Sequence, residues 1–253
     1  MSPQVTLPIE LRGTLPVATL PMFERLGVEA FFTTRDGGVS SGEFASLNLG
    51  SNGPDDPDHV RENFRRVATA IGSESVRRVR QIHSAAVVHI DALDESAEGD
   101  AIITNRVGEA VALIVADCAP LLLVDPAGHQ LAVVHAGWRG LAAGVIEATV
   151  NALDADVSQL HVAIGPAISG DRYQVGPEVI AASPYFAPHA RADVGDRFML
   201  DTRGAALSIL EALSVPRENV SISTQVTDGG ARFFSDRAAR PCGRFALVAK
   251  WQS

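Results

Sequence analysis

Three short apolar runs follow one another in the middle of the chain, and they restrict its fold more than any other feature. They are VALIVA (111–116), LLLVD (121–125) and LAVVHA (131–136). The last two are separated by PAGHQ, which is typical of a turn. Because these runs are apolar throughout rather than alternating, they predict strands that are covered on both faces.

Further strands and helices are expected around this region in a mixed order. A helix from Pro57 to Ile71 would begin behind acidic residues and end at Gly72. A second would open at the GWRG sequence (137–140) and run to about Leu153. Strand and helix do not alternate regularly, which favours an α+β fold with mixed, layered sheets over a doubly wound one. The other predicted elements are strands at 28–34, 77–82, 87–90, 161–164, 220–223 and 245–250, and helices at 177–183 and 201–213.

Composition limits the class of protein. Of 253 residues, 46% are apolar and 20% are charged, which is typical of a globular chain and not of a disordered one. No internal repeat appears, and the polar stretch 91–100 is too short for a linker, so residues 1–253 are expected to form a single domain. The formal net charge of −9 disfavours a nucleic-acid binder or a membrane-surface protein, but it allows a small anion in a locally basic pocket.

Location follows from features that the sequence lacks. The N-terminal segment does not resemble a signal peptide, and no run of about 18 apolar residues exists, so a cytoplasmic protein is expected. Two cysteines, Cys118 and Cys242, cannot form a disulfide framework, which fits a reducing compartment. The nucleotide and hydrolase motifs GxGxxG, GxxxxGKS/T, GxSxG and HExxH are also absent.

Three residues with metal-binding chemistry stand at the ends of predicted strands: His83, Cys118 and His135. Two imidazoles and one thiolate form a three-ligand set for Zn²⁺ that leaves a fourth position open, as in catalytic zinc sites. Closed structural sites use four protein ligands, usually in close CxxC pairs, which this chain lacks. The alternative is a buried core thiol beside two hydrogen-bonded histidines without a metal.

Three charged residues are further candidates for a catalytic site. Arg35 precedes two glycines, where backbone N–H groups could face an anion, although a solvated arginine in an ordinary turn is the simpler interpretation. Arg139 lies at a predicted helix start, which favours an anion site there. Asp117 could orient a ligand or act as a base, or it could simply cap the end of a strand.

Ten segments, spread in order over nearly the whole chain, together resemble one family. The chain is similar to the YfiH-like or laccase-domain proteins, which are also known as polyphenol oxidases and purine nucleoside phosphorylases. The matching segments are FTTRDGGVS (32–40), SLNLG (46–50), DD (55–56) with Asn63, QIH (81–83), DCAPLLL (117–123), VHAGWRG (134–140), AIGPAIS (163–169), YQVG (173–176), FFSDR (233–237) and GR (243–244).

The resemblance implies a fold, a metal site and an activity. It implies a four-layered α/β/β/α arrangement and a zinc site made of His83, Cys118 and His135, with copper as a less favoured metal. The implied activity is phosphorolysis of adenosine, inosine and methylthioadenosine, together with adenosine deamination, and some bacterial members are linked to peptidoglycan-precursor editing. A purine nucleoside and phosphate would be the partners, with Arg35 and Arg139 holding the phosphate.

The chain departs from the family pattern at five single positions and in one segment, where Arg237-Ala238-Ala239-Arg240 stands in place of RRDG. Ser84 stands in place of Gly, Gln174 in place of Glu, and Thr202, Ala206 and Ser223 also differ. These departures put the substrate in greater doubt than the metal.

Three other functions remain open at this point. A Cys118–His135 pair could act as a metal-free hydrolase. Two histidines and a cysteine also match a blue-copper ligand set, but a multicopper oxidase needs many HxH pairs, and the seven histidines of this chain form none. A metal-stabilised binding module without activity is the third. Cys242 and the other five histidines have no partner motif.

Overall fold

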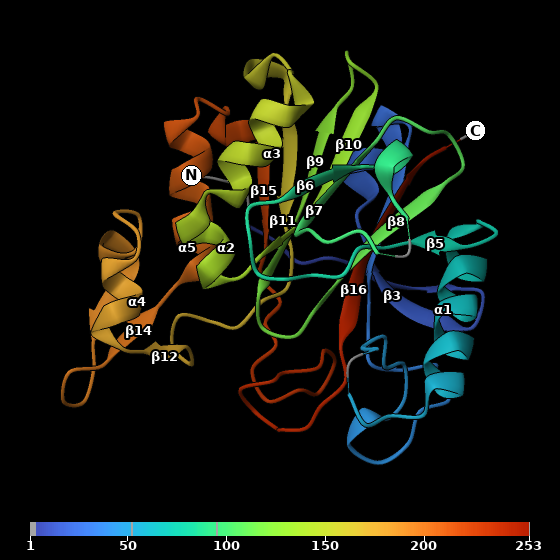
Figure 1. Ribbon diagram of the computed structural model, residues 1–253, viewed down its shortest axis with the longest axis horizontal. Coiled ribbons are helices and arrows are strands. Elements are labelled where there is room, and N and C mark those ends of the chain that lie inside the picture. Colours follow the sequence, from blue (N-terminus) through green and yellow to red (C-terminus); the bar gives the residue numbers. More distant parts are fainter. Residues whose placement is uncertain (1–3, 52, 95, 253) are drawn as a thin grey trace.

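Two large β-sheets lie face to face in the middle of the molecule (Figure 1). The computed structural model describes residues 4–51, 53–94 and 96–252. The first sheet has the strand order β1 (Gln4–Val5), β15 (Val220–Ser223), β11 (His161–Ile164), β9 (Ala119–Asp125), β10 (Gln130–Ala136), β7 (Ala101–Thr104) and β6 (Val87–His89). The second has the order β2 (Ile9–Arg12), β3 (Leu15–Thr19), β4 (Val28–Thr33), β16 (Phe245–Trp251), β8 (Ala110–Val115) and β5 (Val76–Arg77).

Both large sheets are mixed. In the first, β9 pairs antiparallel with β10 and β11, whereas β11 pairs parallel with β15, and β6 with β7. In the second, only the β5–β8 pair of the described strands is parallel. A small third sheet lies to one side, with the order β12 (Gln174–Val175), β14 (Phe198–Leu200) and β13 (Ala190–Ala192).

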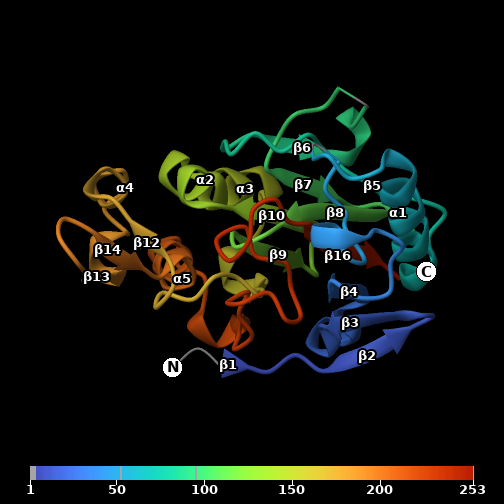
Figure 2. The ribbon, with the colours of Figure 1, turned by 90° about the horizontal axis from the view of Figure 1, so that it is seen from below.

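Helices cover the outer faces of the two large sheets (Figure 2). Helix α1 (Pro57–Ile71) packs on the second sheet, and α2 (Trp138–Ala143), α3 (Val145–Leu153) and α5 (Thr202–Ala212) pack on the first. A short helix, α4 (Pro177–Ala181), lies beside the third sheet. Short 3-10 helices occur in the connections at Pro21–Leu26, Gly42–Phe44, Ile90–Ala92, Val157–Gln159, Ala187–His189 and Arg217–Asn219. The expected α+β fold with four α/β/β/α layers is therefore confirmed.

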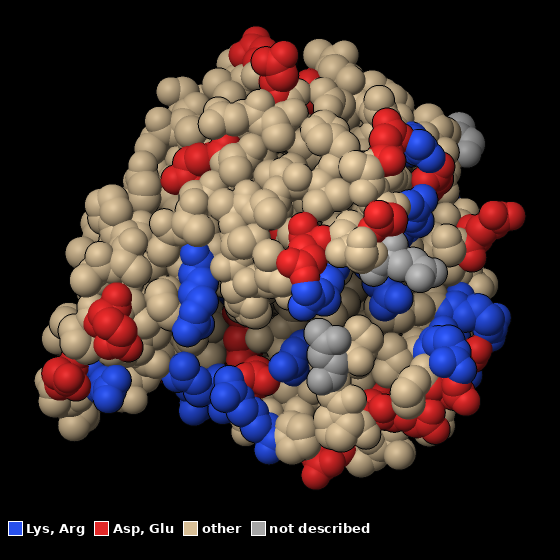
Figure 3. Space-filling view, viewed as in Figure 1, with Lys and Arg blue, Asp and Glu red and all other residues tan. Residues whose placement is uncertain are grey.

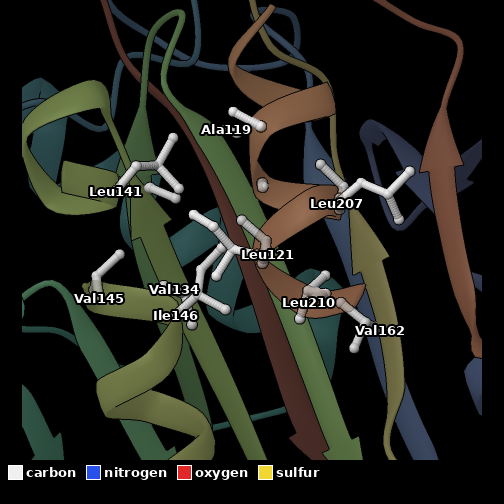
Figure 4. Packing of buried hydrophobic residues seen from close by; sticks show 14 of the residues in the cluster. Ala119, Leu121, Val134, Leu141, Val145, Ile146, Val162, Leu207 and Leu210 are labelled. Carbon is white, nitrogen blue, oxygen red and sulfur yellow. The ribbon is translucent and has the colours of Figure 1, made fainter. Parts of the chain in front are cut away.

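The central strands are apolar on both faces because each face borders a different core. Leu122 and Val124 of β9 point between the two sheets. Leu121 of the same strand points the other way and packs with Val134 of β10 against α2, α3 and α5, as Figure 4 shows. Neighbouring side chains on a strand alternate between its faces, so a strand between two apolar layers must be apolar at every position.

Local signals explain which sequence predictions hold. Helix α1 begins at Asp56, whose carboxylate accepts the N–H of Asp58 at 2.8 Å, and ends before Gly72 in the left-handed region, as predicted. The predicted helix from 137 to 153 is instead two helices, because Gly144 adopts φ 86° between them. The strand predicted at 77–82 is wrong beyond Arg77, since the chain there turns toward the site described next.

Strands β1–β3, β7 and β12–β14 were not predicted, because they are short or lack a distinct apolar pattern. Over the described residues, no helix combines the length and apolarity that crossing a membrane requires.

Candidate metal centre and cleft

His83, Cys118 and His135 come together at one end of the two large sheets. His83 lies in the loop between β5 and β6, Cys118 directly precedes β9, and His135 lies near the end of β10. Their potential ligand atoms all lie within 4.8 Å of one another, and the two imidazole rings meet edge to face at 4.8 Å between centroids. We call these three residues the His–Cys–His cluster. His135 is buried, Cys118 is half-buried and His83 is exposed, so the cluster opens to solvent on one side.

A buried aspartate, Asp100, positions two members of the cluster. Its carboxylate accepts a hydrogen bond from Nδ1 of His135 at 2.8 Å. It also accepts the backbone N–H groups of His83 at 3.0 Å and Ser84 at 2.6 Å, which secures the loop where His83 adopts φ 59°. Because Asp100 occupies Nδ1 of His135, Nε2 is the nitrogen left for a metal. Asp100 was not among the predicted site residues, since one aspartate before an apolar strand carries no distinctive signal.

The residues of the cluster shift one another's pKa values. Burial by itself would raise the pKa of Cys118, but His135 and His83 outweigh it and lower this pKa to about 6. Burial would lower the pKa of His135, but the Cys118 thiolate and Asp100 raise it to about 9. Burial would likewise raise the pKa of Asp100, but hydrogen bonds from His135 and Ser84 lower it to about 2. The lowered pKa favours the thiolate of Cys118, which is the form that binds metals, whereas His135 must lose a proton before its Nε2 can bind one.

Gly137 makes room for the cluster. A Cβ atom at this position would lie 2.8 Å from Sγ of Cys118 and 3.4 Å from a ring carbon of His83. Only glycine therefore fits between β10 and α2, directly beside the sulfur.

The cluster lies in the wall of a large cleft of about 1270 Å³. Phe44, Trp138 and Tyr173 also line it, and so do seven arginines of the described chain: Arg77, Arg78, Arg80, Arg139, Arg237, Arg240 and Arg244. Figure 3 shows basic side chains on both sides of a hollow in the lower half of the molecule, with acidic side chains inside it. The cleft is thus lined by arginines, and of the two expected at an anion site only Arg139 is among them.

Arg35, a predicted anion ligand, does not line this cleft. Its Nε and Nη2 donate to the carbonyl oxygen of Ala45 at 3.1 and 3.0 Å, and its Nη1 donates to that of Gly230 at 2.6 Å. The guanidinium carbon also lies 4.8 Å from the centroid of the Phe234 ring. All three guanidinium nitrogens therefore hold loops together, and the structure does not bring Arg35 to the His–Cys–His cluster.

Asp117 and Arg139, the other two candidates, do line the cleft. The carboxylate of Asp117 accepts the Thr227 hydroxyl at 2.5 Å and the backbone N–H of Arg237 at 2.7 Å, so both oxygens are engaged in joining loops. The guanidinium of Arg139 lies over the ring of its neighbour Trp138 at 4.2 Å.

Several motifs behind the family resemblance meet around the buried Asn63 of α1. Its amide donates to the carbonyl oxygens of Ser46 at 3.2 Å and Asn48 at 2.9 Å, and its Oδ1 accepts the N–H of Val39 at 2.9 Å. Asn48 in turn accepts the N–H of Arg244 at 2.8 Å. These motifs build the wall of the cleft that Asn48 and Arg244 line.

None of the five single departures from the family pattern lines the cleft, but Arg237 and Arg240 of the departing segment 237–240 do. The hydroxyl of Ser84 donates to the same buried carboxylate that holds His135. Gln174 lies in β12, Thr202 and Ala206 are buried in α5, and Ser223 ends β15. The five single departures therefore lie behind the cleft, whereas the segment 237–240 forms part of its wall.

Comparison with known proteins gives a family match over most of the chain. The model of a family described as "Multi-copper polyphenol oxidoreductase laccase" matches residues 29–252. The Pseudomonas aeruginosa protein named purine nucleoside phosphorylase PA4543 is 40% identical over 235 residues, which are 87% of this chain and 92% of that protein. The Escherichia coli protein named purine nucleoside phosphorylase YfiH is 36% identical over 228 residues, 87% and 92% of the two chains.

A solved structure has the same fold. The crystal structure of Neisseria meningitidis protein NMB0706 superposes with a TM-score of 0.84 at 35% identity, and the match covers 90% of this chain and 95% of that one.

Proposed function

Since the chain belongs to the laccase-domain family, and its relatives carry the name purine nucleoside phosphorylase, we propose that it is a metal-dependent purine nucleoside phosphorylase. The observation that supports this most is the His–Cys–His cluster in the wall of an arginine-lined cleft. A phosphorolytic enzyme must hold a purine nucleoside and a phosphate together, and such a cleft offers both apolar and cationic walls.

The residues of the cluster fit zinc. Zn²⁺ favours imidazole and thiolate ligands, and a site with three protein ligands keeps one position open. When bound there, zinc would supply a Lewis acid beside the cleft. His83, Cys118 and His135 would hold it, and Asp100 would orient His135. Copper is the alternative metal, and elemental analysis of protein purified without added metal distinguishes the two.

Different residues of the cleft would bind the purine base and the phosphate. Trp138 and Phe44 offer apolar surface for a purine base, and Arg139 offers a cation for the phosphate that attacks the ribose. Adenosine, inosine and methylthioadenosine are the proposed nucleosides. The cleft is wide enough that its volume alone does not select among them.

Inosine tests this function directly. Metal-loaded protein is incubated with inosine, with and without phosphate, and we expect hypoxanthine and ribose 1-phosphate only where phosphate is present. The Cys118→Ala variant is expected to lose both bound metal and turnover. If the wild-type protein carries its metal and forms neither product, the phosphorylase proposal is wrong.

Adenosine deamination is a second candidate activity, because it needs an activated water beside the base, and the open side of the cluster faces the cleft. Release of inosine and ammonia from adenosine without phosphate would support it.

A metal-free hydrolase with a Cys118 nucleophile is a third candidate, since the pKa of this thiol is lowered to about 6 beside His135. A covalent adduct on Cys118 in active, metal-free protein would support it, and one bound metal per active chain would exclude it.

A further inference from the structure

The arginines of the cleft fall into two groups according to their ion pairs. Arg77, Arg80, Arg240 and Arg244 each lie within 4.0 Å of a carboxylate, those of Glu109, Glu98 and, for the last two, Asp236. Within the described residues, Arg78, Arg139 and Arg237 have no such partner. Cations without a protein counter-charge are the ones available to an anionic ligand.

Of these three arginines, Arg237 packs on Tyr173, and Arg139 lies next to the His–Cys–His cluster. The guanidinium carbon of Arg237 lies 5.1 Å from the centroid of the Tyr173 ring, and its Nη1 donates to the carbonyl oxygen of Gln174 at 2.9 Å. That single bond anchors the guanidinium and leaves its other N–H groups unengaged in the described structure. Arg139 lines the same cleft two residues after Gly137, which lies beside the sulfur of Cys118, and its guanidinium lies over the Trp138 ring at 4.2 Å.

The third, Arg78, lies elsewhere in the cleft. Its guanidinium carbon is 3.7 Å from the centroid of the Phe64 ring in α1, which packs on the second sheet. It therefore belongs to a different wall from Tyr173.

Tyr173 supplies a hydroxyl donor at this position. No described group hydrogen-bonds its phenol, which lines the cleft and is not among the buried unpartnered atoms. Burial raises the pKa of Tyr173 to about 12, and the charge of Cys118 contributes to the rise, so the phenol keeps its proton.

We propose that Arg139, Arg237 and the hydroxyl of Tyr173 form the binding site for the phosphate, beside the His–Cys–His cluster. Two guanidinium groups and a phenol match the several acceptor oxygens of a tetrahedral oxyanion. Asp117, a carboxylate of the cleft wall, directs its two oxygens to the Thr227 hydroxyl and the backbone N–H of Arg237. The identification of the anion as a substrate rests on the proposed phosphorylase function, whereas the site itself does not.

Binding of inorganic phosphate to the metal-loaded protein tests the site without turnover. Isothermal titration calorimetry is carried out on the wild type and on Arg139→Lys, Arg237→Lys and Tyr173→Phe. Lysine keeps the charge but loses the forked donor geometry, so these variants fold while losing hydrogen bonds. Each is expected to bind phosphate about tenfold or more weakly, the effect of one lost charge-assisted hydrogen bond.

Two control variants separate a defined site from general positive charge. Arg240→Ala removes a cleft arginine that is paired with Asp236, and Arg232→Ala removes an exposed arginine outside the cleft. Both are expected to bind phosphate within about twofold of the wild type. The proposal is overturned if the wild type does not bind phosphate, if the two lysine variants bind like the wild type, or if Arg240→Ala weakens binding equally.

Kinetics separate this proposal from the function on which it rests. In an active enzyme the same three variants are expected to raise the KM for phosphate more than the KM for inosine. If the wild type binds phosphate through these residues but does not cleave inosine, the phosphorylase proposal fails and the anion site stands. If inosine is cleaved and the KM for phosphate is unchanged in all three variants, the anion site fails and the phosphorylase stands.

Discussion

At the scale of single residues, the hydrogen bonds of a side chain decide whether it serves the metal site or the surrounding loops. Asp100 shows this most clearly, since its buried carboxylate holds both Nδ1 of His135 and the loop that carries His83. Second partners of this kind orient a metal-binding imidazole and increase its basicity. Arg35 shows the reverse case, because its hydrogen bonds to carbonyl groups give it a structural task.

Replacing Asp100 by asparagine is therefore expected to weaken metal binding by about 10- to 100-fold, because the amide no longer holds a charged partner against His135. Zinc affinity is measured by competition with a chromogenic chelator. Asp125→Asn serves as the matched control, since Asp125 is also buried but accepts the N–H of Ala127 at 3.1 Å, away from the cluster. Equal zinc affinities in the wild type and Asp100→Asn would contradict this role.

Because of Tyr173, the free energy of unfolding is expected to fall at alkaline pH. The pKa of its phenol rises from 10.0 to about 12, first because of burial and then because of Cys118. Between these values the unfolded chain loses the proton while the folded protein keeps it, so the free energy of unfolding falls as pH rises through this window. The full effect is on the order of 2 kcal/mol.

Tyr173→Phe is accordingly expected to lose less stability than the wild type between pH 9 and about 11.5. Urea unfolding followed by tryptophan fluorescence measures the two slopes. If the free energy of unfolding falls equally steeply with pH in both proteins, folding does not raise the pKa of the Tyr173 phenol.

At the scale of elements, backbone conformation at element ends decides where side chains point. The GWRG segment leads from β10 into α2, and Gly137 leaves space for the sulfur of Cys118. About two turns later, Gly144 adopts φ 86° and starts α3 in a new direction, so that Val145 and Ile146 reach the core on the first sheet. Apolar periodicity predicted one helix here, since it does not register a single left-handed residue.

Gly144→Ala tests this break. A Cβ at this position would find its nearest neighbour at 3.6 Å, in Glu147, so the expected loss of about 1–2 kcal/mol comes from the left-handed backbone alone. Urea unfolding measures it, with Gly53→Ala as control, because Gly53 is not left-handed and its Cβ would meet only Phe44 at 3.9 Å. A loss no larger than that of the control would mean that the break is not required.

At the scale of the whole molecule, the two sheets bury their apolar faces against each other and against the helices on either side. Each central strand contributes alternate side chains to two cores, and the cleft opens where the loops at one end of these sheets meet. The sheets therefore act as a rigid support that brings residues 83 and 118, from two different connections, together with residue 135 near the end of β10.

The core between the sheets is expected to dominate stability without shaping the metal site. Leu122→Ala, at a fully buried position, should lower the free energy of unfolding by about 2–5 kcal/mol. Leu11→Ala, at a side chain that is 72% exposed, should change it by less than about 0.5 kcal/mol. Zinc content per folded chain should be equal in both, and a loss of zinc in Leu122→Ala would show that this core and the cluster are coupled.

The sequence by itself determined the features that depend on neighbouring residues. The β-rich runs between 111 and 136, the capped helix α1 and the motifs that suggested the His–Cys–His cluster are all legible from local pattern and spacing. Hydrogen bonds between distant residues are not local, and only the tertiary structure decided them. Asp100 meets His135 across 35 residues, and Arg35 meets Gly230 across 195. Such pairings depend on how the sheets stack, so the structure alone showed that Arg139, Arg237 and Tyr173 line the cleft while Arg35 holds loops.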